Sequence, residues 1–130
     1  MSLSIEPRLE PGLQPSPLPT VVSLTRCCAT ETGPEEPLER LTEIMRETAA
    51  LAEREGGLIG HVKAWLAPGG GGGGVALSLV RREVRIRKLP PASAEPAAAT
   101  RISLTAIIYG LEEKTLAEFL ERKMERAFPA

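Results

Sequence analysis

The sequence predicts an α+β domain: a two-layer sandwich in which a mostly antiparallel sheet of three or four strands carries two helices on one face. Two observations support this class. Apolar residues recur at three- and four-residue steps in two stretches, as in amphipathic helices. In the remaining stretches they alternate with polar residues, as in half-buried strands. The stretches follow one another in the order β-α-β-β-β-α.

The first nineteen residues differ in composition from the rest of the chain. Residues 1–19 contain five prolines, which remove backbone donors and restrict the residues that precede them to extended conformations. We therefore expect a disordered tail there and a single domain over residues 20–130. The run from Thr20 to Thr30 is rich in β-branched residues and predicts the first strand.

A helix is predicted from Glu35 to Glu55, where the apolar stripe is strongest. Pro37 suits a first helical turn, and the glutamates before and after it lie at the positive end of the helix dipole. The glycine pair at positions 56 and 57 provides a stop. A helix of this length spans roughly 30 Å, enough to cover a sheet.

Two strands flank a run of glycines. The segment Leu58–Ala67 alternates with a period of two, which places Ile59, His61, Lys63 and Trp65 together on the outer face. Residues 68–74, a proline and six glycines, predict a flexible loop. The return strand starts at Val75, and its apolar phase shifts by one residue between Val80 and Arg82, which we interpret as a β-bulge.

The last third of the chain predicts a loop, a strand and a helix. Residues 89–100 contain three prolines and form the second flexible loop. The segment Arg101–Tyr109 alternates again and ends at Gly110. From Leu111 to Phe128 a second amphipathic stripe predicts the C-terminal helix.

The composition excludes several kinds of catalytic site. The chain has 130 residues and a formal net charge of −1, and all seventeen of its acidic residues are glutamate, with no Asp or Asn. A Ser-His-Asp triad, an EF-hand and an aspartic dyad are therefore excluded. One histidine and two adjacent cysteines are too few for most zinc sites, so we expect no metal and no cofactor. The glycine run lacks the Lys-Ser/Thr of a phosphate-binding P-loop.

The sequence bears on the cellular compartment and the source of the protein only indirectly. We find no apolar run long enough to span a bilayer and no signal peptide, and two neighbouring cysteines cannot form a disulfide framework, so we expect a cytoplasmic protein without a membrane partner. The missing Asn fits a heat-adapted source, although codon bias produces the same composition.

The charges are unevenly distributed. Residues 1–60 hold five basic and ten acidic groups, whereas residues 61–110 hold seven and two. On the predicted sheet the outer face gathers Lys63, Trp65, Arg85, Arg87 and Thr105, which we take as candidate binding residues, together with His61, Arg81, Glu83, Ser103 and Tyr109.

Three interpretations of this face stay open. It can be the solvated face that antiparallel sheets commonly have. It can be covered by a second copy in a homo-oligomer, which would bury Ile59, Trp65, Ile107 and Tyr109. It can bind a small anionic ligand or single-stranded nucleic acid, with nucleic acid disfavoured by the net charge and the missing RNP aromatics. The arginines of strand 81–88 also suit an edge strand protected from aggregation.

Catalysis has few candidate residues. His61 would be the general base, Tyr109 the acid, and Arg85 or Arg87 an anion clamp. Cys27 and Cys28 are reactive thiols or, more commonly for cysteines in a strand, small packed side chains. The sequence favours a non-enzymatic module that self-associates and binds a protein partner or small anion. The alternatives are a small enzyme using His61 and a weak single-stranded nucleic-acid binder using strand 81–88.

Overall fold

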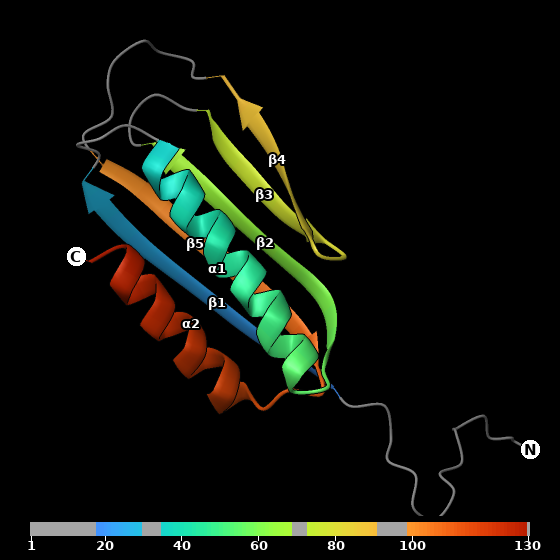
Figure 1. Cartoon of the computed structure of the whole chain (residues 1–130). Coiled ribbons are helices and arrows are strands. Elements are labelled where there is room, and N and C mark those ends of the chain that lie inside the picture. The colour runs from blue at the N-terminus through green and yellow to red at the C-terminus, as the bar shows by residue number, and fades with distance from the viewer. Residues whose placement is uncertain (1–17, 30–34, 69–72, 91–98, 130) are drawn as a thin grey trace, which may run out of the picture.

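The computed structural model describes residues 18–29, 35–68, 73–90 and 99–129 (Figure 1). Its elements in chain order are β1 (Pro19–Ala29), α1 (Glu35–Arg54), β2 (Leu58–Pro68), β3 (Gly74–Val80), β4 (Glu83–Leu89), β5 (Ala99–Tyr109) and α2 (Glu113–Ala127). The predicted α+β class is confirmed. Pro19, assigned to the tail by sequence, opens β1; residues 1–17 and most of both predicted loops lie outside the described residues.

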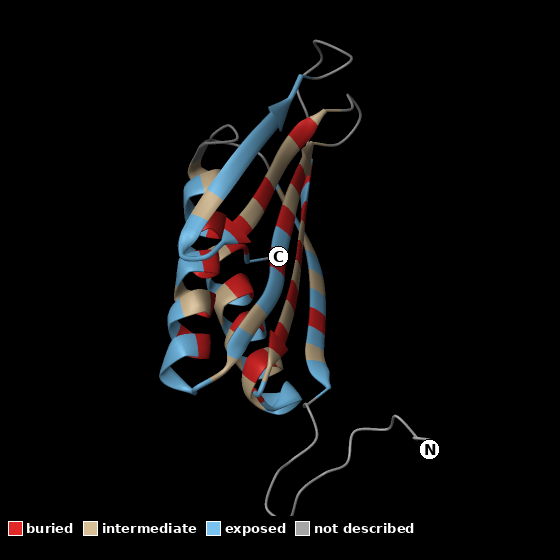
Figure 2. Cartoon of the chain, turned by 90° about the vertical axis from the view of Figure 1, so that its right-hand side faces the viewer, coloured by how far each residue is buried: buried red, intermediate tan, exposed pale blue. Residues whose placement is uncertain are grey.

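The strands form one antiparallel sheet in the order β1-β5-β2-β3-β4. The expected number of three or four strands was too low, because the segment after the glycine run forms two strands instead of one. Both helices lie on the same face of the sheet (Figures 1 and 2). No helix in the described part of the chain is long and apolar enough to cross a membrane.

The core lies between the helices and the sheet, and it is built from the predicted stripes. Fully buried side chains at helical spacing come from α1 (Leu41, Met45, Thr48, Ala52) and α2 (Leu116, Leu120, Met124). Alternate residues of β5 meet them: Ile102, Leu104, Ala106 and Ile108. Burying each large aliphatic side chain contributes on the order of 1.5–3 kcal/mol to folding. Figure 2 shows the resulting alternation of buried and less buried residues along the central strands.

The predicted bulge between Val80 and Arg82 was wrong. The chain reverses there in a two-residue turn, so that Val80 pairs with Glu83 and the strand continues backwards as β4. Such a turn shifts the apolar phase by one residue, as a bulge does, and the sequence pattern cannot distinguish them. Arg81 therefore lies in the turn, with a φ of 61°, and not in a strand row as we expected.

A register irregularity does occur, in β2. The pairing of β2 with β5 shifts between Ile59 and His61, which leaves Gly60 as the extra residue. Ile59 consequently lies opposite Ile108 and packs against the core. The expectation that Ile59 lies on the open face was therefore wrong.

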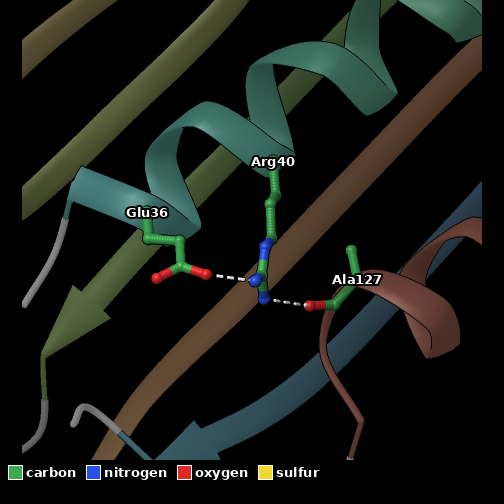
Figure 3. A network of polar contacts seen from close by, with 3 residues as sticks. All are labelled: Glu36, Arg40 and Ala127. Carbon is green, nitrogen blue, oxygen red and sulfur yellow. Dashed lines mark hydrogen bonds and ion pairs between the residues drawn. The ribbon is translucent and has the colours of Figure 1, made fainter. Parts of the chain in front are cut away.

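Two arginines attach the C-terminal end of α2 to the rest of the fold. Arg26 Nε on β1 donates to the Phe128 carbonyl oxygen over 2.9 Å, and an Arg40 guanidinium nitrogen on α1 donates to that of Ala127, also over 2.9 Å. Figure 3 shows Arg40 between this carbonyl and the carboxylate of Glu36, with which it forms an ion pair. Both arginines thus satisfy carbonyls that the helix leaves without an internal partner.

Candidate ligand-binding site on the open sheet face

On the sheet face opposite the helices, the register aligns side chains in rows that cross all five strands. One row is Ser23, Thr105, Lys63, Ser78 and Arg85, and the next is Thr25, Ser103, Trp65, Ala76 and Arg87. Neighbouring rows lie about 7 Å apart, since alternate residues of a strand share a face. The structure thus brings all five predicted binding residues into two adjacent rows.

An open depression of about 490 Å³ lies over β3 in these rows. Its lining includes every predicted binding residue: Lys63, Trp65, Arg85, Arg87 and Thr105. Ala76 and Ser78, the β3 residues of the two rows, are small, whereas their neighbours on β2 and β4 have long side chains. The depression therefore has a floor along β3 and walls along β2 and β4.

The walls carry positive charge without compensation. Lys63, Arg85 and Arg87 line the depression, and no carboxylate does. None of the three forms an ion pair with a residue that the structure describes; the ion pairs found there use Arg40, Arg46, Arg82 and Lys123. Neighbouring like charges without counter-charges create a positive potential that attracts anions.

Trp65 closes one end of the depression. Gly74 has a φ of +140°, and a Cβ built on it would stand 2.8 Å from Cζ2 of Trp65 and 2.5 Å from the Leu66 carbonyl oxygen. The indole thus occupies the space that a side chain at this position would need, and glycine is required there. Leu89 lies opposite Gly74 on β4, beyond the residues that line the depression.

Hydroxyl groups complete the lining. The Thr105 hydroxyl is hydrogen-bonded to that of Ser23 over 2.9 Å, on the side towards β1. Ser78 and Ser103 also line the depression, and within the described ranges no hydrogen bond of their hydroxyls is found. Both can therefore donate to a bound anion.

The catalytic candidates divide between two depressions. His61 is exposed and lines a second depression, and the Tyr109 ring lies beside Gly60, which also lines that depression. Arg85 and Arg87 line the first depression. The proposed base and acid therefore lie at one depression and the proposed anion clamp at the other.

The second depression, of about 720 Å³, lies between α1 and the tip of the β3–β4 hairpin. It opens where β2 and β3 separate, beyond the paired residues Lys63 and Ser78. Its lining is largely apolar, and Arg82 at its rim is already paired with Glu53 of α1. It has less free positive charge than the first depression.

The two cysteines are free thiols in different surroundings. Cys27 is exposed, while Cys28 points towards the core and is half-buried. Burial raises the pKa of the Cys28 thiol, the neighbouring Cys27 raises it further, and Arg40 partly offsets both. A raised pKa keeps the thiol protonated, which disfavours nucleophilic chemistry. Among the described residues no cluster of His, Cys and Glu could hold a metal ion.

Sequence reasoning missed the floor of the depression. Gly74 was placed in the loop, and Ala76 and Ser78 were treated as ordinary strand positions. A small residue between two long ones in adjacent strands marks a groove. That signal is visible only once the hairpin pairs β3 with β4.

Comparison with known proteins adds no assignment. Neither a protein-family model nor a curated protein matches the chain. Two solved structures resemble it, Zn(II)-bound YjiA GTPase from E. coli and a Zn(II)-bound triple mutant of YjiA GTPase, with TM-scores of 0.44 and 0.45 and 11% identity. Each alignment covers 79% of this chain but 29% of the other. A likeness this weak, over less than a third of the longer chains, carries no conclusion about this protein.

Proposed function

We propose that the protein is a non-enzymatic cytoplasmic binding module that holds a small anionic ligand in the open-face depression. The observation that carries the proposal is the set of three cations, Lys63, Arg85 and Arg87, around one depression whose lining has no carboxylate. Arginine offers a planar fork of donors to a phosphate or carboxylate, and lysine adds a point charge. The hydroxyls of Ser78 and Ser103 supply neutral donors.

Two simpler interpretations explain less of this surface. A solvated antiparallel face tends to intersperse both signs of charge, but the one acidic residue of β4, Glu83, lies beside the turn and outside the depression. Protection of an edge strand would require charges on β4 alone. Lys63 lies on β2, two strands away from that edge, and carries the same charge.

Calorimetric titration with inorganic phosphate tests the proposal. We expect binding at low salt that weakens as sodium chloride is raised, because salt screens exposed charges. Arg85→Ala and Lys63→Ala should each lower the affinity about tenfold, the value of one charge-assisted hydrogen bond.

Lys88→Ala is the matched control, because Lys88 lies on the same strand with its side chain on the helix face, opposite Val75. Its phosphate affinity should remain close to that of the wild type. Absence of phosphate binding at low salt, or an equal loss in the Lys88 variant, would refute the proposed site.

Self-association is a second candidate, and the contrast between the two sheet edges favours β1 as its interface. Of the eleven residues of β1 only Arg26 is charged, and it donates to Phe128. Four of the seven residues of β4 are charged. A two-fold dimer centred on the depression would also set its cations against their copies. Antiparallel pairing of β1 with a second β1 avoids both conflicts.

Light scattering after size-exclusion chromatography tests this second candidate. We expect a dimer at high micromolar concentration, and Thr25→Lys should shift it to monomer because an edge lysine opposes strand pairing. Ala50→Lys, on the exposed side of α1, adds the same charge away from the edge and should leave the dimer intact. A wild-type monomer at this concentration would exclude the dimer.

A further inference from the structure

The depression has a charged half and an aromatic half, and we propose that its ligand is a small aromatic anion of the nucleoside monophosphate class. This inference rests on the proposed anion-binding function and specifies the ligand for the same site. It uses features that anion binding alone leaves unexplained: the position of Trp65, and the separation along β3 between Arg87 and the pair of Lys63 and Arg85.

The charged half is centred on Ser78. In the register this residue lies between Lys63 on one side and Arg85 on the other. Neighbouring strands are about 4.8 Å apart, so the side chains that carry an ammonium, a hydroxyl and a guanidinium start from adjacent positions on the open face. A phosphate placed there would receive hydrogen bonds from all three groups.

The aromatic half is centred on Ala76, which lies between Trp65 and Arg87. The methyl side chain of Ala76 leaves space above the strand, and the indole borders that space at Gly74. In the described part of the chain the one cation–ring contact joins Lys123 to Phe119, so the Arg87 guanidinium is not stacked on the indole. A planar group above Ala76 can therefore contact both the ring and the guanidinium.

The spacing of the two halves selects the class of ligand. Ala76 and Ser78 are two residues apart on one strand, a separation of about 7 Å. Inorganic phosphate would fill only the charged half, and a sugar phosphate would leave the aromatic half without a ring. A nucleoside monophosphate joins a phosphate to a planar base through a sugar and can occupy both.

Titration of the full-length protein with AMP, ribose 5-phosphate, adenosine and inorganic phosphate tests the inference. AMP should bind at least about fivefold more tightly than ribose 5-phosphate, the lower range for stacking of one base on an aromatic side chain. Adenosine, without the phosphate, should bind more weakly than AMP. Trp65 is the single tryptophan of the chain, so AMP should also change the intrinsic tryptophan fluorescence.

Substitutions of Trp65 assign the gain to the indole. Trp65→Leu should reduce AMP affinity to that of ribose 5-phosphate, while Trp65→Phe should keep part of the gain. Tyr109→Leu removes an open-face aromatic outside the depression and should have no effect on AMP affinity.

The outcomes separate this inference from the proposed function. Equal affinities for AMP and ribose 5-phosphate, or an AMP gain that survives Trp65→Leu, would overturn the aromatic anion while leaving anion binding intact. If AMP, ribose 5-phosphate and inorganic phosphate all fail to bind, the proposed function itself is overturned. The fluorescence and ligand comparisons use the wild-type protein and decide the question even if Trp65→Leu does not fold.

Discussion

The ring of Tyr109 lies directly over Gly60, at the irregular position of β2. A Cβ built on Gly60 would stand 3.0 Å from Cε1 of Tyr109 and 3.2 Å from the carbonyl oxygen of Ile107. The φ of Gly60 is not positive, so the glycine is needed for space and not for backbone conformation. The aromatic ring thereby packs beside the unpaired residue of the strand, which is itself exposed.

Gly60→Ala should lower the free energy of unfolding by about 1 kcal/mol, since the added Cβ would crowd the Tyr109 ring and the Ile107 carbonyl oxygen at this exposed position. Urea denaturation measures the change. In the Gly60→Ala/Tyr109→Ala double variant the cost of the alanine should fall, because the ring that it contacts is gone. Strictly additive losses in the two single variants would show that the ring and the glycine do not interact.

The turn between β3 and β4 predicts a stabilising substitution. Arg81 has a φ of 61° at the first of two turn residues, a conformation that glycine adopts without steric cost and that favours glycine in type II′ hairpins. Arg81→Gly should raise the free energy of unfolding by up to about 1 kcal/mol. Arg82→Gly is the control, because Arg82 has no positive φ and loses its ion pair with Glu53; a gain there would contradict the explanation.

The sequence predicted the grouping of the binding residues although the predicted connection between two strands was wrong. A bulge and a two-residue hairpin both shift the apolar phase by one residue. Either of them places Arg85 and Arg87 on the face of Lys63 and Trp65. The alternation was therefore sufficient for the face, but not for the number of strands.

Other features could not be predicted because they depend on contacts between distant segments. A shift at Gly60 leaves both Leu58 and Ile59 as plausible core residues, and only the pairing with β5 places Ile59 inside. Likewise, the glycine run showed no reason for Gly74 in particular. Position 74 needs a glycine because the indole of Trp65, on the neighbouring strand β2, occupies the space of a side chain there.

The arginines at the end of α2 should differ in their contributions. Arg26 is half-buried and donates through Nε to Phe128, whereas Arg40 is exposed and donates to Ala127. Arg26→Leu should cost about 1–3 kcal/mol, because it leaves a partly buried carbonyl without its donor. Arg40→Leu should cost clearly less, since water can replace an exposed donor. Urea unfolding measures both, and a larger loss for Arg40→Leu would contradict the burial argument.

Cys28 should make the fold less stable at alkaline pH. Its pKa in the folded state is raised, chiefly by burial, so above the pKa of an unfolded thiol the unfolded chain releases this proton more readily than the folded one. The stabilisation is therefore fully present below the unfolded pKa and is lost as the pH rises through the folded value. Cys28→Val should weaken this alkaline loss in urea unfolding, whereas Cys27→Ser, at the exposed neighbour, should largely retain it. At pH 8, iodoacetamide should alkylate Cys27 faster than Cys28, and equal rates would contradict the burial of the Cys28 thiol.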